Sequence, residues 1–180
     1  MKKILITGAA GFIGSHVAEK IFKKFKKSNL VLYDKVTYAA NIKYLKSIIN
    51  SKNVKFVKSD ILDYKCLEKN LKNAEIAINV AAESHVDNSF GNSLLFTKTN
   101  ALGTHSFLEA CRKQKVKKII HVSTDEVYGE NLGKTPFNED QVLNPTNPYS
   151  ASKAAADMIV NSYNHSYKLK IITVRANNIY

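Results

Sequence analysis

Six short apolar runs alternate with stretches of helical periodicity, and this alternation is the feature that most limits the possible folds. The runs are rich in Ile, Val and Leu and lie at residues 3–7, 30–34, 54–58, 75–81, 118–123 and 170–175. Strands that are apolar on both faces and separated by helices are typical of a parallel sheet covered on both sides. The sequence therefore predicts a doubly wound α/β fold.

The size and composition of the chain fit one globular domain. Its 180 residues can bury one sizeable core, with 44% hydrophobic and 23% charged residues. No linker rich in Pro, Gly or Ser divides the chain, so we expect residues 1–180 to form a single domain. The apolar runs are too short to span a membrane, and “MKKILITG” is too short for a secretory signal. We expect a cytoplasmic protein without a membrane partner.

The formal net charge of +12 raises the question of a nucleic-acid partner. Only Arg112 and Arg175 among the 27 basic residues are arginines, and the lysines are scattered through the chain. Because nucleic-acid readout usually uses clustered arginine, we expect a lysine-rich solvated surface and no nucleic acid. The two cysteines, Cys66 and Cys111, match no metal-ligand spacing. We expect reduced, packed thiols and no metal site.

A glycine-rich turn follows the first predicted strand. The segment “TGAAGFIGS” contains Gly8, Gly11 and Gly14 with two residues between each pair. Such a turn lets the backbone approach a pyrophosphate, which the free N–H groups and positive end of the next helix can bind. The pattern predicts the dinucleotide-binding turn of a Rossmann fold, with a turn that serves only packing as the alternative.

Acidic residues end the second and third predicted strands. Asp34 can accept hydrogen bonds from both adenosine ribose hydroxyls and would repel a 2′-phosphate, which favours NAD over NADP. Asp60 could accept a hydrogen bond from the adenine amino group, with Ile61 against the ring. A helix N-cap is an equally good interpretation of Asp60 alone.

Tyr149 and Lys153 lie four residues apart in “NPYSASKAAAD”, on one face of a predicted helix. A nearby ammonium and a nicotinamide cation would both lower the phenol pKa from its usual value of about 10, so that the phenolate could act as a base. Hydroxyls at Ser123 and Thr124 could bind the reacting oxygen. The set predicts hydride transfer, whereas the pair alone would fit an ordinary surface helix.

Two adjacent acids, Asp125 and Glu126, follow the fifth predicted strand, where a turn would need only one. They belong to the segment “STDEVYG”, which occurs with “TGAAGFIGS”, “YDKVTYAAN”, “AAESHVDNSF”, “NPYSASKAAAD” and “VRANNIY”. Together these segments resemble the extended short-chain dehydrogenases/reductases, and among them the nucleotide-sugar 4,6-dehydratases that act on dTDP-glucose or UDP-glucose. The resemblance covers the whole chain. “STDEVYG” discriminates best, because sister epimerases and decarboxylases lack the paired acids.

The resemblance implies a role for each catalytic candidate. Thr124 would bind the C4 oxygen of the sugar, and Tyr149, assisted by Lys153, would take the C4 hydroxyl proton while NAD takes the hydride. Glu126 would then remove the C5 proton, and Asp125 would protonate the departing C6 hydroxyl. Return of the hydride to C6 and of a proton to C5 would give the 4-keto-6-deoxy sugar.

The resemblance also implies the binding residues. The NAD site would comprise Gly8, Gly11, Phe12, Ile13, Gly14, Asp34, Lys35, Val36, Thr37, Asp60, Ile61, Ala81, Ala82, Thr99, Tyr149 and Lys153. Ser84 and Asn178 would contact the hexose or its diphosphate. A homodimer would form through helices near residues 93–113 and 149–166.

The family pattern continues beyond Tyr180 with a carboxy-terminal substrate domain, so residues 1–180 correspond to the NAD-binding domain with its catalytic residues. The leading functional hypothesis is a dTDP-glucose 4,6-dehydratase. The alternatives are a UDP-glucose 4,6-dehydratase, an epimerase or decarboxylase on the same scaffold, and a non-catalytic NAD-binding module.

Overall fold

The six apolar runs form one parallel sheet in the computed structural model, which describes residues 2–179. The strands are β1 (Lys3–Thr7), β2 (Asn29–Asp34), β3 (Val54–Lys58), β4 (Ile76–Asn79), β5 (Lys118–Thr124) and β6 (Ile171–Ala176). Their order is β3-β2-β1-β4-β5-β6, and every neighbouring pair is parallel. The predicted doubly wound fold is confirmed. The strand order reverses between β1 and β4, where such sheets bind ligands.

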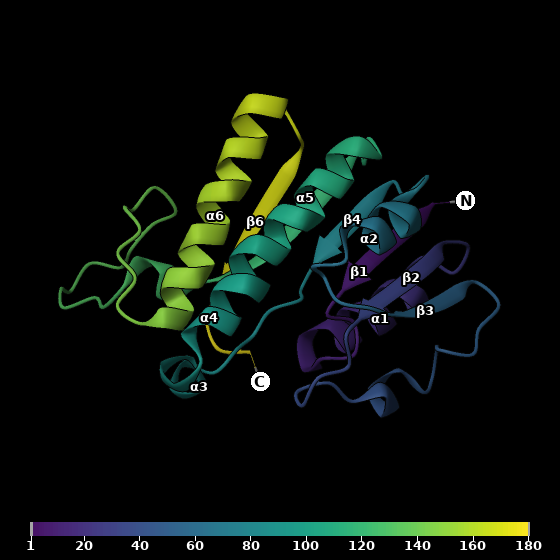
Figure 1. The fold of residues 1–180 in the computed structure, drawn as a ribbon, viewed down its shortest axis with the longest axis horizontal. Coiled ribbons are helices and arrows are strands. Elements are labelled where there is room, and N and C mark those ends of the chain that lie inside the picture. Colours follow the sequence, from purple (N-terminus) through teal and green to yellow (C-terminus); the bar gives the residue numbers. More distant parts are fainter. Residues whose placement is uncertain (1, 180) are drawn as a thin grey trace.

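Helices connect the strands and cover both faces of the sheet. They are α1 (Phe12–Lys24), α2 (Tyr64–Leu71), α3 (Val86–Gly91), α4 (Ser93–Phe96), α5 (Gly103–Lys113) and α6 (Pro148–Tyr167). Two short 3₁₀ turns, η1 (Ile42–Leu45) and η3 (Asp125–Tyr128), and one π-helical segment, η2 (Thr97–Leu102), complete the described elements. Figure 1 shows α5 and α6 side by side across one face of the sheet.

The core lies on both sides of the sheet because successive strand residues point to opposite faces. Leu5 and Val31 pack with residues of α2, α5 and α6, whereas Ile4, Ile6 and Leu32 pack on the side of α1 and η1. Buried apolar residues on both faces explain why the strands read as continuous apolar runs. None of the helices within residues 2–179 is both long and apolar enough to cross a membrane.

β4 is shorter than the predicted strand at 75–81. It ends at Asn79, and the N–H groups of Val80 and Ala81 donate to the Thr7 hydroxyl oxygen at 3.2 and 3.3 Å instead of extending the ladder. The Thr7 side chain of β1 therefore directs the chain out of the sheet after β4, next to the glycine-rich turn.

The helix predicted near 93–113 is interrupted by the π-helical segment η2. The wider π turn changes which residues face the core, so Leu94 and Leu102 are 72% and 54% exposed while Leu108 is fully buried.

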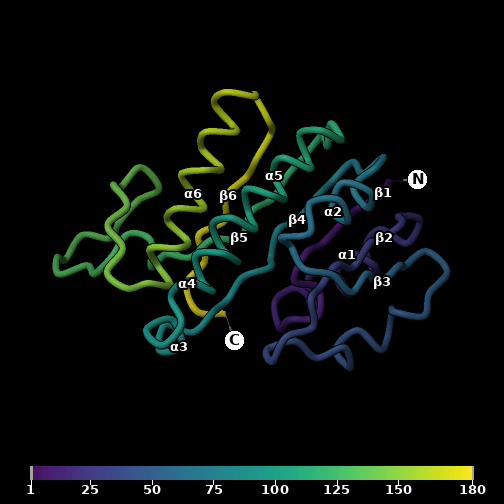
Figure 2. The backbone as a smooth tube through the Cα atoms, viewed as in Figure 1, coloured from purple at the N-terminus to yellow at the C-terminus, as the bar shows by residue number. Residues whose placement is uncertain are grey.

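The long connection between η3 and α6, residues 129–147, projects from one end of the molecule, as the green part of the tube in Figure 2 shows. It returns to the body at Asn147, the N-cap of α6, and Pro148 follows at the first helical position. Proline suits this position because its fixed φ matches the helix and its missing N–H has no partner there. The start of α6 is therefore well defined next to η3.

Candidate active site

The glycine-rich turn at the end of β1 requires glycine at two of its positions. Gly8 has φ +63°, and a Cβ there would lie 2.6 Å from the backbone nitrogen of Ala81. A Cβ on Gly14 would collide with the carbonyl oxygen of Gly8. The turn thus brings the start of α1 against the ends of β1 and β4, and leaves its backbone open to a ligand.

A cavity of about 370 Å³ opens at the carboxyl ends of the strands beside this turn. The predicted site residues that line it are Gly8, Gly11, Phe12, Ile13, Gly14, Asp34, Lys35, Thr37, Asp60, Ile61, Ala81, Ala82, Ser84, Thr99, Tyr149 and Lys153. Val36 does not line it, because the chain turns there with φ +60° and the Val36 N–H points to Asp34. The fold therefore brings together residues that lie as many as 145 positions apart in the sequence, from Gly8 to Lys153.

Asp34, only 8% exposed, ties the glycine turn to the end of β2. Its Oδ2 accepts from the Ala10 N–H at 2.8 Å and its Oδ1 from the Val36 N–H at 2.7 Å. A carboxylate has about four acceptor sites, so Asp34 can still accept from hydroxyls in the cavity. These two bonds fix the direction of the carboxylate before any ligand binds.

Asp60 forms an ion pair with Lys35, with 2.7 Å between Oδ2 and Nζ. Burial raises the pKa of Asp60, but the Leu62 N–H and the Lys35 ammonium outweigh it, and the pKa is lowered overall. Asp60 is not the N-cap of α2, because Asp63 holds that position and accepts from the Cys66 N–H at 3.0 Å. The N-cap alternative for Asp60 is therefore wrong.

The adjacent acids lie on η3, just beyond the residues that line the cavity. Thr124 caps η3: its hydroxyl oxygen accepts from the Glu126 N–H at 3.3 Å, and the hydroxyl donates to Asp125 Oδ1 at 3.2 Å. The side-chain nitrogen of Asn147 donates to Glu126 Oε2 at 3.2 Å. The two carboxylates therefore have different hydrogen-bond partners.

Tyr149 occupies the first turn of α6 and reaches the cavity near these acids. Burial raises the pKa of the phenol, the Thr124 hydroxyl lowers it, and the charges of Glu126 and Asp125 raise it again. The pKa is raised overall, contrary to the lowering that we predicted from Lys153. The physical reason is that the Lys153 Nζ donates to the Val122 carbonyl at 2.7 Å, while partial burial and the two nearby carboxylates raise the pKa of the phenol.

Lys153 is itself a buried cation, only 3% exposed. Burial lowers its pKa to about 8, partly opposed by the charge of Asp157. The ammonium is thus held at a fixed point in the floor of the cavity, one helical turn after Tyr149. It provides positive charge and a hydrogen-bond donor at this end of the site.

The cavity also contains residues that the sequence analysis missed. Glu83 lines it, and its Oε2 accepts from the Tyr38 hydroxyl at 3.3 Å. The buried Asn100 of η2 fixes the Glu83 backbone, accepting from its N–H at 2.8 Å and donating to its carbonyl at 3.0 Å. Glu83 could have been suspected from its neighbours Ala82 and Ser84, but Asn100 stands in an ordinary helical pattern and gave no signal.

One predicted substrate residue lies apart from the cavity. Asn178 is exposed in the segment after β6, and its N–H donates to the Asn177 side-chain oxygen at 2.6 Å. The contribution of Asn178 to a substrate site stays a prediction.

A buried polar chain runs through the sheet behind the site. The Thr7 hydroxyl donates to Asn79 Oδ1 at 2.6 Å, and the Asn79 side-chain nitrogen lies 3.2 Å from His121 Nδ1. Across the ring, His121 Nε2 lies 3.5 Å from Asp157 Oδ1, and Arg175 Nε donates to Asp157 Oδ2 at 2.9 Å. Burial lowers the pKa of His121. This series of buried polar contacts connects β1, which carries the glycine-rich turn, with α6 and β6.

The strand order, the glycine turn after β1 and the Tyr–Lys pair beside the end of β5 define the class of extended short-chain dehydrogenases/reductases. The sequence model of the family described as GDP-mannose 4,6 dehydratase matches residues 5–180, and the chain belongs to this family. The resemblance inferred from the six sequence segments is confirmed.

Relatives with assigned names extend this comparison. The chain is 50% identical over 192 residues to dTDP-D-glucose 4,6-dehydratase of Dictyostelium discoideum, a match over 100% of this chain and 44% of that protein. It is 49% identical over 184 residues to a trifunctional UDP-glucose 4,6-dehydratase/epimerase/reductase of Arabidopsis thaliana, over 99% of this chain and 28% of that protein.

A solved structure shows the same fold. The dTDP-glucose 4,6-dehydratase of Bacillus anthracis, determined in complex with NAD, superposes with a TM-score of 0.90 at 39% identity, over 100% of this chain and 56% of that chain. This chain thus spans about half the length, or less, of these relatives.

Proposed function

We propose that the protein acts as an NAD-dependent nucleotide-sugar 4,6-dehydratase, with dTDP-glucose as the leading substrate. The observation that carries the proposal is the placement of Asp125 and Glu126 on η3, where Glu126 accepts a hydrogen bond from Asn147, two residues before Tyr149. Hydride transfer alone needs one base, whereas the elimination of water needs a further acid and base. Both named relatives carry 4,6-dehydratase in their names.

The residues present fit NAD. The glycine turn leaves open the space that a Cβ on Gly8 would fill, and the Asp34 carboxylate faces the cavity with acceptor sites to spare. A carboxylate at this point favours ribose hydroxyls over a 2′-phosphate. NAD, when bound, would accept the hydride from C4 of the sugar and return it to C6.

The side chains of this chain would carry the proton transfers. Tyr149 takes the proton of the C4 hydroxyl, and the Thr124 hydroxyl donates to the C4 oxygen. Glu126 removes the C5 proton, which the 4-ketone has made acidic, and Asp125 protonates the C6 hydroxyl so that it leaves as water. Each acid or base contributes a factor of about 10²–10⁴ in rate. Lys153, one helical turn after Tyr149, places an ammonium at the same cavity.

We also propose that residues 1–180 form the NAD-binding domain of this enzyme, because the chain spans only about half of its relatives. Ser84 lines the cavity and is proposed to contact the hexose, together with Asn178. A UDP-glucose substrate is the alternative that the Arabidopsis relative supports. The two free cysteines fit the reducing environment of a cytoplasmic protein.

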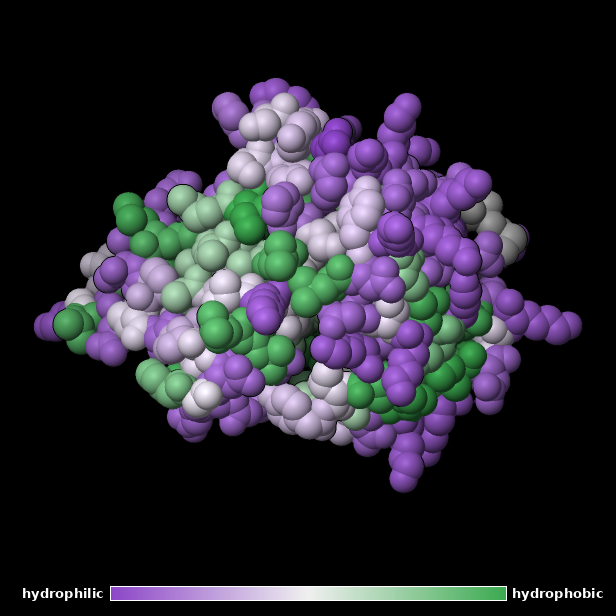
Figure 3. Space-filling view, viewed as in Figure 1, coloured by the Kyte–Doolittle hydropathy of each residue, from purple (hydrophilic) through white to green (hydrophobic). Residues whose placement is uncertain are grey.

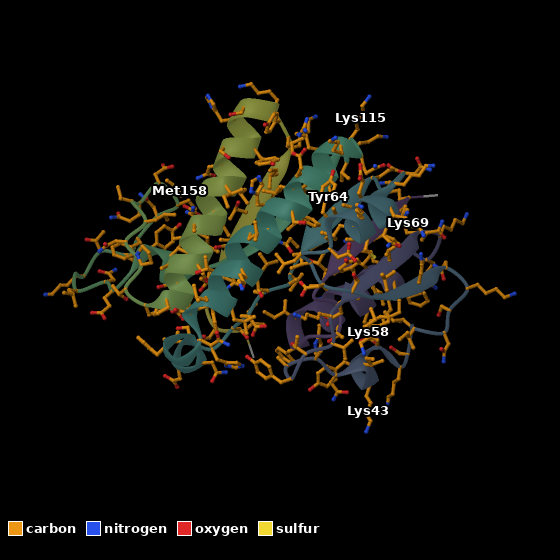
Figure 4. All side chains as sticks on the ribbon, viewed as in Figure 1. Lys43, Lys58, Tyr64, Lys69, Lys115 and Met158 are labelled. Atoms are coloured by element: carbon orange, nitrogen blue, oxygen red, sulfur yellow. The ribbon has the colours of Figure 1, made fainter. Side chains whose placement is uncertain are left out.

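A homodimer is proposed to form through α4, η2, α5 and α6. Apolar side chains gather over these helices on the face shown in Figure 3. They include Leu94, Leu102 and Met158, and Figure 4 shows Met158 on the outer side of α6. Of the lysines labelled in Figure 4, Lys43, Lys58 and Lys69 lie away from this surface on η1, β3 and α2.

The decisive experiment incubates the full-length gene product, loaded with NAD, with dTDP-glucose and separately with UDP-glucose. A dehydratase forms a 4-keto sugar, which alkali reveals by its absorbance, and the preferred donor identifies the nucleotide. An epimerase would instead form the C4 epimer, and a binding module would retain NAD without turnover. Absence of keto sugar from both donors would refute the proposal.

A further inference from the structure

Asn147 makes two kinds of contact at the start of α6. Its Oδ1 accepts from the Ser150 N–H at 2.8 Å, and the Ser150 hydroxyl oxygen accepts from the Asn147 N–H at 3.2 Å, which together form a capping box. Its side-chain nitrogen donates to Glu126 Oε2 at 3.2 Å. One side chain therefore joins the helix that carries Tyr149 to the proposed base on η3.

The capping bond determines how the Asn147 amide points. Because Oδ1 must face the Ser150 N–H, the NH₂ group is the end that faces Glu126. An amide nitrogen can only donate. Glu126 therefore meets a fixed hydrogen-bond donor at Oε2, which orients its side chain.

Asp125 has a different partner. The Thr124 hydroxyl donates to Asp125 Oδ1 at 3.2 Å, but a hydroxyl can rotate and accept as well. The same Thr124 hydroxyl oxygen also accepts from the Glu126 N–H at 3.3 Å. The surroundings of the two neighbouring acids differ in the way that one base and one acid require.

We propose, resting on the dehydratase function above, that Asn147 is a positioning residue that holds the Glu126 side chain aligned with Tyr149 for removal of the C5 proton. The nucleotide sugar makes no contact with Asn147 in this proposal. Asn147 acts through Glu126 alone, and its capping of α6 is a separate, structural role. The two roles can be separated by substitution, because several residues cap helices equally well.

The test compares Asn147→Ser with the wild-type, full-length protein loaded with NAD. Serine caps helices about as well as asparagine but cannot reach Glu126 with an amide donor. We expect unchanged formation of bound NADH in a single turnover, and dehydration slowed by about tenfold, the effect of losing one hydrogen bond to a charged group. The isotope effect of deuterium at C5 should increase, because C5 proton removal becomes slower.

Two further variants sharpen the comparison. Asn147→Asp also caps the helix, but its carboxylate would repel Glu126, so dehydration should be slower than in Asn147→Ser. Asn144→Ser makes the same substitution three residues earlier, at an exposed side chain that forms none of the hydrogen bonds found in residues 2–179. It should behave as the wild type.

Equal losses of NADH formation and dehydration in Asn147→Ser would overturn the inference, because they would show that Asn147 only supports α6. Unchanged dehydration with an unchanged isotope effect would overturn it as well. A wild-type protein that binds NAD but forms neither NADH nor keto sugar would instead overturn the proposed function, and this inference with it.

Discussion

Lys153 shows how burial alters the properties of a single residue. The side chain is almost fully enclosed, its Nζ donates to the Val122 carbonyl, and burial lowers its pKa to about 8. In the unfolded chain the pKa of Lys153 is near 10.5. Between these two pH values the unfolded state holds more protons than the folded state, so the contribution of Lys153 to stability increases with pH.

We predict that Lys153→Met removes this pH dependence. The wild type should gain stability relative to the variant by up to about 3 kcal/mol as the pH rises from 8 to 10.5, because each pKa unit corresponds to about 1.4 kcal/mol. Urea unfolding of both proteins across this range measures the difference. A constant difference would mean that Lys153 does not titrate there. The variant should also lose hydride transfer.

A substitution at Glu126 can separate the oxidation at C4 from the elimination of water. We predict that Glu126→Gln still oxidises C4 of the sugar, because Tyr149 and Lys153 remain, but loses about 10²–10⁴ in the rate of water elimination. Bound NADH should accumulate, and its absorbance measures this. Glu130→Gln, at an exposed glutamate four residues later, is the matched control. Undiminished dehydration in Glu126→Gln would refute the role of Glu126 as base.

At the level of elements, three segments meet at one arginine. Arg175 of β6 donates from Nε to Asp157 of α6 at 2.9 Å, and from Nη1 to the Tyr128 hydroxyl of η3 at 2.6 Å and to the Glu139 carbonyl at 3.1 Å. Its guanidinium also lies 4.9 Å from the centre of the Tyr128 ring. This junction holds η3, and with it the acid pair, against the end of the sheet.

We predict that Arg175→Met destabilises the fold by about 3–5 kcal/mol, since it leaves the buried Asp157 carboxylate without its principal partner. Tyr128→Phe removes one hydrogen bond and should cost only about 1 kcal/mol. Arg112→Met is the control, because Arg112 pairs with Glu109 on the helix surface. Denaturant midpoints rank the three variants. A smaller loss for Arg175→Met than for Arg112→Met would contradict the prediction.

At the scale of the whole molecule, the outer surface of α4, η2, α5 and α6 carries exposed apolar side chains. Leu94, Leu102 and Met158 expose apolar side chains there, whereas a helix side that faces water is normally polar. Burying such a surface against a second copy would remove it from water. The proposed dimer interface therefore includes α6, the helix that carries Tyr149 and Lys153.

We predict that Leu94→Asp combined with Leu102→Asp converts the proposed full-length dimer to a monomer that still binds NAD. A buried charge opposes association strongly when it has no partner. Light scattering after size-exclusion chromatography measures the mass. Leu132→Asp is the matched control, because Leu132 is 93% exposed on the projecting connection, outside these helices. Loss of the dimer in Leu132→Asp alone would place the interface elsewhere.

The sequence alone was sufficient for the features that depend on neighbouring residues. Strand-sized apolar runs, the spacing of Gly8 and Gly14, and the position of Asp34 follow from local geometry, and the structure gathers them around one cavity. The four-residue spacing of Tyr149 and Lys153 likewise places both at that cavity. These patterns repeat with the period of a strand or a helix, so they are visible without the tertiary fold.

Only the tertiary structure decided the features that join residues far apart in the chain. The bond from Lys153 to the Val122 carbonyl, the Asn147 contact with Glu126 and the Asp157–Arg175 pair span 31, 21 and 18 residues. Their formation depends on how β5, η3, α6 and β6 pack against one another. Such packing leaves no repeating pattern in the sequence from which these contacts could be predicted. Burial, which set the pKa directions of Tyr149 and Lys153, is likewise a property of the folded whole.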